Sequence, residues 1–189
     1  MNSPIHFCTG YLAGRAVGYR EYRFETLFVA VAAYSPDFDS QLRKLSPFFA
    51  HGIWTHTIVG VVAMSLVLAT LAFVLLRWFK PDANLTFRRL LGLAILGGMT
   101  HLFLDAFTFY YSEGDATHHR YLWPVWNFPW HINTMFPGAT FGLRVWVEVI
   151  YSVGVASVIL LYQWLYRGQN PFRMFDPRKW FYTEKEPAS

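Results

Sequence analysis

The sequence predicts an all-α fold, a polytopic bundle of helices embedded in a membrane. Hydrophobic residues make up 54% of the 189 residues and charged residues only 15%, whereas a typical soluble domain carries about 25% charged residues. Aromatic residues reach 20%, which excludes a disordered chain, because such chains are poor in aromatic side chains. With so few charges to cover a soluble surface, we expect an integral membrane protein whose partners are membrane lipids and not nucleic acid.

Two short apolar stretches open the chain, at residues 5–17 and 24–34. Both are shorter than the roughly 20 residues that a membrane-spanning helix needs, so they predict two short N-terminal helices that pack in the bundle or lie at the interface. Three longer apolar stretches follow, at residues 53–78, 90–111 and 143–166. Their lengths predict three transmembrane helices.

The Lys and Arg residues predict the orientation of the bundle. They concentrate in residues 15–23, in residues 77–89 and in the C-terminal tail. Because loops rich in Lys and Arg stay in the cytoplasm, we expect the connection at 112–142 to face outward. Residues 1–170 are predicted to form one transmembrane domain and residues 171–189 a polar, basic cytoplasmic tail, in a bacterial or archaeal cytoplasmic membrane.

Ionisable residues in or beside the apolar stretches are the candidates for function, because such residues are costly in a membrane and usually functional. On the expected topology they fall in one layer near the outer face of the membrane. The candidate metal ligands are His6, Asp37, Asp39, His51, His56, His101 and Asp105. Outside this set, Glu148 is expected to pair with Arg144, and His118 and His119 are expected to be solvated.

Two pairs among these residues have the spacing of a shared site. His101 and Asp105 lie one helical turn apart, so they share a helix face and can reach one metal ion. His51 and His56 lie where a loop runs into the predicted helix at 53–78, which allows their side chains to converge.

Asp37 and Asp39 follow the dipeptide Ser35-Pro36. The residue before a proline is biased away from the helical conformation, so we expect an extended segment here. Alternate residues of an extended chain point the same way, which predicts that both carboxylates face the site. One of them, Asp37 or Asp39, is the expected general base of a reaction at this site.

The types of the candidate ligands limit which metal ions can bind. Imidazole and carboxylate ligands without thiolates suit zinc, manganese or iron. The chain has a single cysteine, Cys8, which excludes a cysteine-based zinc site. Zinc is favoured, and the number of candidate ligands allows one or two divalent ions.

Five motifs of the chain occur in the order of a known family. They are His6 with Gly10, Pro36-Asp37-Phe38-Asp39, His51-Gly52-Ile53-Trp54-Thr55-His56-Thr57, Thr100-His101 with Asp105, and Leu122-Trp123-Pro124. In these motifs the chain resembles the predicted membrane-bound metal-dependent hydrolases, the YdjM-like inner-membrane proteins, with Gly52 where the family has arginine. The resemblance implies a metal-dependent hydrolase, and a looser similarity of the ligand set to zinc phospholipase C implies a phosphoester or lipid-like substrate.

Two alternative functions stay open. A transporter, or an ion- or proton-handling protein, also uses intramembrane His and Asp residues. Such a protein should carry polar side chains through the full depth of the membrane, whereas the only hydroxyl side chains of residues 59–76 are Ser65 and Thr70. A non-catalytic membrane protein with a structural metal site would bind metal without turnover.

Overall fold

All regular structure in the described part of the chain is helical, and this part contains no strand. This confirms the all-α class for these residues. The structure is a computed structural model, and it describes residues 3–16, 23–46, 52, 54–106, 120–127, 154, 156–165, 168, 170, 172 and 175–181.

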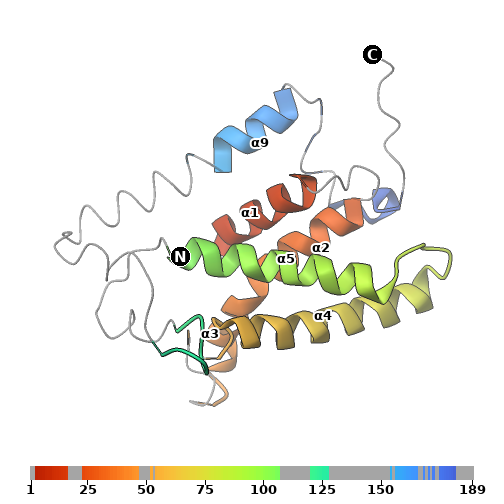
Figure 1. Cartoon of the computed structure of the whole chain (residues 1–189). Coiled ribbons are helices and arrows are strands. Elements are labelled where there is room, and N and C mark those ends of the chain that lie inside the picture. The colour runs from red at the N-terminus through yellow and green to blue at the C-terminus, as the bar shows by residue number, and fades with distance from the viewer. Residues whose placement is uncertain are drawn as a thin grey trace.

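The two short N-terminal helices are confirmed. They are α1 (Ser3–Ala16) and α2 (Arg23–Tyr34), and they pack side by side in Figure 1. Small residues permit this close packing: a Cβ atom added at Gly10 would lie 2.5 Å from the Cβ atom of Ala33. A larger side chain at position 10 would therefore push the two helices apart.

Two helices, and not three, are long and apolar enough to cross a membrane within the described residues. They are α4 (Ile58–Phe79), of 22 residues, and α5 (Phe87–Ala106), of 20 residues. At 1.5 Å per residue each is about 30 Å long, the thickness of a bilayer core. The predicted third span, 143–166, is described only as the ten-residue helix α9 (Ala156–Leu165), and its remainder lies outside the described residues.

Helix α4 begins later than the apolar pattern predicts. Residues 54–57 form a turn, and Thr57 caps the helix by accepting a hydrogen bond from the Gly60 main-chain nitrogen at 2.9 Å. Threonine is a good N-cap residue. Because apolar residues also precede it, the apolar pattern placed the start of the helix too early. The consequence is that His56 lies in the turn and not on the helix.

The surface of α4 fits a lipid environment. Its buried residues, Val61, Ser65 and Ala69, form one narrow stripe toward α5. The rest of the helix exposes large apolar side chains, and Val67 and Leu71 are each 55% exposed. An apolar surface of this length would be poorly hydrated in water, whereas it is well solvated by lipid tails.

Helix α5 lies between α2 and α4 (Figure 1). Its glycines allow both contacts: an added Cβ atom would lie 2.5 Å from the Val29 main-chain oxygen at Gly97 and 2.5 Å from Val61 Cγ1 at Gly98. Both α2 and α5 run toward the same end of the bundle. At the opposite end the buried Glu25 carboxylate of α2 pairs with both Nε and Nη2 of Arg89 of α5.

The described residues of the C-terminal part lie at the end of the bundle that carries Glu25 and Arg89. The short helix η5 (Pro177–Lys179) is followed by Trp180, whose main-chain oxygen accepts a hydrogen bond from the Phe24 nitrogen at 3.2 Å. The ring of Phe181 also stacks on that of Phe24. The predicted division of the chain at residue 170 stays a prediction.

We expect Gly97→Ala to destabilise the protein by roughly 1–3 kcal/mol, because the new methyl group meets main-chain atoms of α2 that cannot move alone. Thermal unfolding in detergent, followed by tryptophan fluorescence, measures this effect. Gly92→Ala is the matched control, since an added Cβ atom there has nothing within 4 Å and alanine favours the helix over glycine. Equal melting temperatures for Gly97→Ala and the wild type would contradict the close packing.

Candidate metal centre

The segment after α2 is helical, which corrects the expected extended conformation. It forms a 3-10 helix, η1 (Ser35–Phe38), which continues into the short helix α3 (Asp39–Leu42). Pro36 occupies the first turn of η1, where its fixed φ angle suits a helix and its missing N–H group is not needed. The Ser35 hydroxyl donates a hydrogen bond back to the Ala32 carbonyl at 2.8 Å and joins the two helices.

Because of this helical turn, Asp37 and Asp39 approach His56 from different sides. Asp37 Oδ1 lies 3.5 Å from Nε2 of the His56 ring. Asp39 Oδ2 lies 3.3 Å from Nδ1 of the same ring. The two carboxylates therefore contact opposite nitrogens, and the expectation that they point the same way is wrong.

Asp39 is the anchor of the turn that carries His56. Its Oδ2 atom accepts hydrogen bonds from the Thr55 hydroxyl at 2.5 Å and from the Gly52 main-chain nitrogen at 3.0 Å. Gly52 has φ +83°, a left-handed conformation that favours glycine. With Nδ1 of His56 facing Asp39, Nε2 is left to face the centre of the cluster. Carboxylates commonly orient metal-binding histidines in this way.

Helix α5 supplies His101 and Asp105, and the predicted turn spacing is confirmed. Nδ1 of His101 lies 2.7 Å from the Ala33 main-chain oxygen of α2. A carbonyl only accepts hydrogen bonds, so Nδ1 carries a proton and Nε2 is the nitrogen that can ligate a metal ion. Nε2 then lies 3.1 Å from Asp105 Oδ2.

Three ligand atoms converge at this point with the spacing of a metal site. His101 Nε2 is 3.1 Å from His56 Nε2, and His56 Nε2 is 3.4 Å from Asp105 Oδ2. Ligands about 2.0–2.1 Å from a tetrahedral zinc ion lie about 3.3–3.4 Å apart. All three residues are buried. The donor types and their spacing therefore fit a divalent metal.

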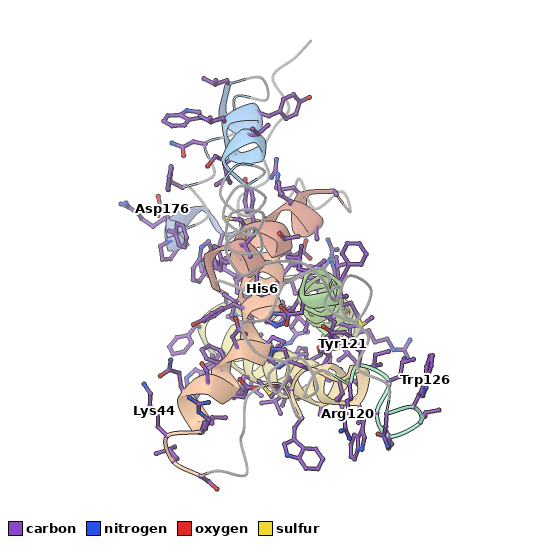
Figure 2. All side chains as sticks on the ribbon, turned by 90° about the vertical axis from the view of Figure 1, so that its left-hand side faces the viewer. His6, Lys44, Arg120, Tyr121, Trp126 and Asp176 are labelled. Atoms are coloured by element: carbon purple, nitrogen blue, oxygen red, sulfur yellow. The ribbon has the colours of Figure 1, made fainter. Side chains whose placement is uncertain are left out.

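His6 of α1 joins the cluster from the other side. Its ring stacks on His101 with 3.7 Å between centroids, and its Nε2 lies 3.3 Å from Asp105 Oδ1. His6, Asp37 and His101 form a second group whose ligand atoms lie within 4.8 Å of one another. Figure 2, which looks onto the site end of the bundle, shows His6 near the middle, whereas Lys44 and Trp126 lie at the periphery.

His6 and His56 differ in their pKa values and therefore in their protonation. Burial lowers the pKa of His6, and the neighbouring His101 adds to this effect, so that the pKa falls to about 4. Burial also disfavours a charged His56, but the carboxylates of Asp37 and Asp39 outweigh it and raise the pKa to about 9. At neutral pH His6 is therefore a neutral imidazole with a free lone pair.

The structure thus brings together six of the candidate ligands, His6, Asp37, Asp39, His56, His101 and Asp105. His51 lies outside the described residues, as do Arg144, Glu148, His118 and His119. The Ala33 carbonyl, the Gly52 nitrogen and the Thr55 hydroxyl were not predicted. Gly52 and Thr55 had a signal in the sequence, because each is adjacent to a candidate ligand, His51 or His56.

Aromatic side chains border the cluster. Trp54 lies two residues before His56 and packs edge-on against Trp123, with 5.1 Å between ring centroids. The segment that carries Trp123 is held to the start of α4, because the Ile58 nitrogen donates to the Tyr121 oxygen at 2.9 Å. Trp126 is more than half exposed. Tryptophan is enriched at the headgroup level of membranes.

The chain matches the family described as YdjM inner membrane protein over residues 1–172. It belongs to this family. No curated protein matches the chain, and no solved structure matches it. The family match confirms the resemblance seen in the sequence. Together with the two apolar helices, it indicates that this YdjM family member is a membrane protein.

In this YdjM family member, Asp39→Asn and Thr55→Val should each lower the affinity for zinc by about 10–100-fold, because both residues orient His56 and neither is placed as a direct ligand. Competition with a chromogenic zinc chelator in detergent measures the affinity. Thr70→Val is the matched control, since within the part of the chain that the structure describes the Thr70 hydroxyl bonds only to the Leu66 oxygen of its own helix, at 2.7 Å. Unchanged affinity in both site variants would refute the anchoring role.

Proposed function

We propose that this YdjM family member is a membrane-bound metal-dependent hydrolase that acts on a phosphoester or lipid-like substrate. The observation that carries the proposal is the convergence of His56, His101 and Asp105, with their ligand atoms 3.1–3.4 Å apart. Catalytic zinc sites use three protein ligands and keep one position for water or substrate, whereas structural zinc sites use four.

The residues of the chain fit the roles that hydrolysis needs. A divalent cation held by this triad, with zinc favoured and manganese or iron as alternatives, would polarise a phosphoryl or carbonyl oxygen and lower the pKa of water toward neutrality. Asp39 and the Ala33 carbonyl fix the orientation of the two imidazoles. Asp37 faces the same nitrogens, where a carboxylate either ligates metal or accepts a proton from water.

The surroundings of the centre favour an amphiphilic substrate. Phe38, Trp54 and Ile58 lie beside the cluster in sequence and are all partly exposed. They would contact the apolar part of a lipid-like molecule while its polar group reaches the metal. A lipid headgroup is such a group, and it lies at the depth where tryptophan is enriched.

We also propose the orientation of the bundle. The end opposite the centre carries Arg77, Arg88 and Arg89, and basic ends stay in the cytoplasm. The centre then lies toward the outer face, with residues 143–166 as a third span and the tail in the cytoplasm. Transport is less well supported, because the buried stripe of α4 has Ser65 as its only polar side chain.

The double variant His101→Ala/Asp105→Ala should lose its bound metal and reduce hydrolysis to background while still inserting into the membrane. Elemental mass spectrometry of detergent-purified protein measures the metal, and release from a panel of phosphodiesters and phospholipids measures activity. Thr100→Ala is the control, since among the described residues the Thr100 hydroxyl bonds only the Gly97 oxygen. Metal binding without turnover of any substrate would favour a structural site, and no metal in the wild type would refute the proposal.

Cysteine labelling tests the orientation, because Cys8 is the only cysteine. In a Cys8→Ala background, a membrane-impermeant maleimide should label Asn127→Cys in intact spheroplasts and should label Lys185→Cys only after lysis. The exposed Asn127 belongs to the segment 120–127, which is held to the start of α4 at the same end of the bundle as the centre. The reverse pattern would place the centre on the cytoplasmic side.

A further inference from the structure

His101 can serve only one metal ion, although it belongs to two groups of candidate ligands. Its Nδ1 carries the proton that is donated to the Ala33 carbonyl at 2.7 Å, so only Nε2 can ligate. Nε2 lies 3.1 Å from both His56 Nε2 and Asp105 Oδ2. His101 therefore belongs to the site with His56, and any site that includes His6 needs other ligands.

The burial of His6 indicates that it belongs to a second site, separate from that of His101. Its side chain is fully buried, and neither ring nitrogen forms a hydrogen bond with the described residues. Nε2 nevertheless lies 3.3 Å from Asp105 Oδ1. A lone pair and a carboxylate oxygen repel each other at this distance unless a proton or cation lies between them. The separation is also that of two ligands on one metal ion, about 3.3–3.4 Å.

Asp105 offers one oxygen to each side of the cluster, and Asp37 has a second oxygen that is free to do the same. Asp105 directs Oδ2 to His56 and His101, at 3.4 and 3.1 Å, and Oδ1 to His6. Asp37 directs Oδ1 to the same two histidines, at 3.5 and 3.7 Å. Its Oδ2 is buried and has no hydrogen-bond partner among the described residues. Asp105 thus has the arrangement of a carboxylate that bridges two metal ions, and Asp37, with a ligand atom within 4.8 Å of His6, has a buried oxygen left for the same role.

We propose that the centre is binuclear: Asp37 and Asp105 bridge two divalent cations, one held by His56 and His101 and the other by His6. The inference rests on the proposed metal centre and specifies its composition. Bridged metal ions lie about 3.5–4 Å apart and clamp the attacking and leaving oxygens of a phosphoester. Asp37 is then a ligand and not the general base. The second ion also accounts for the buried Nε2 atom of His6, which faces Asp105.

Metal stoichiometry tests the proposal in the full chain. Detergent-purified protein is stripped with a chelator, reloaded with Zn²⁺ and measured by elemental mass spectrometry. We expect two equivalents in the wild type and one in His6→Ala, with two retained in Cys8→Ala, the control on the same helix. With Mn²⁺ in place of zinc, electron paramagnetic resonance should show an exchange-coupled pair in the wild type and an isolated ion in His6→Ala.

The outcomes separate this proposal from the proposed function. One equivalent in the wild type, with an uncoupled Mn²⁺ signal, would overturn the binuclear centre and leave the hydrolase proposal standing. Two equivalents in both the wild type and folded His6→Ala would overturn the role of His6. No metal in the wild type would overturn both proposals. The wild-type count is decisive even where His6→Ala fails to fold.

Discussion

The candidate metal centre depends on how closely α5 approaches α2. Gly97 leaves no room for a Cβ atom against the Val29 carbonyl, and one turn later His101 reaches the Ala33 carbonyl of the same helix. This hydrogen bond fixes the tautomer of the imidazole and the direction of Nε2. The imidazole of His101 is thus positioned by main-chain packing, and at the far end the pair of Glu25 and Arg89 holds the same two helices together.

The bundle buries two groups of ionisable side chains, the pair of Glu25 and Arg89 and the cluster around His101. The energetic cost of burial is compensated differently in each group. Burying ionisable groups is unfavourable unless opposite charges and hydrogen bonds compensate. Glu25 is compensated within the chain by the bidentate contact with Arg89. The cluster around His101 leaves both nitrogens of His6 and one oxygen of Asp37 without a hydrogen bond in the described residues. Buried polar atoms without hydrogen bonds destabilise a fold, whereas the same atoms are available to bind cations.

The sequence predicted the described helices and which side chains come together, but not the positions of individual residues within the cluster. Apolar length identified α1, α2, α4 and α5, and turn spacing placed His101 beside Asp105, because these signals are local. The rule for residues before a proline failed at Ser35, since Pro36 also fits the first turn of a helix. That error assigned Asp37 and Asp39 the same role. The Ala33 carbonyl was unpredictable, because a main-chain acceptor is present at every residue.

The position of the centre at one end of the long helices reconciles two requirements. Divalent ions and water must come from the aqueous phase, whereas a site that strengthens electrostatic interactions must exclude bulk water. His56 meets both requirements because it precedes α4, in a turn closed by the Thr57 cap. Its imidazole points into the bundle, while the helix that follows exposes an apolar surface. In addition, α2 and α5 both end at the centre, and the negative ends of their helix dipoles favour cations there.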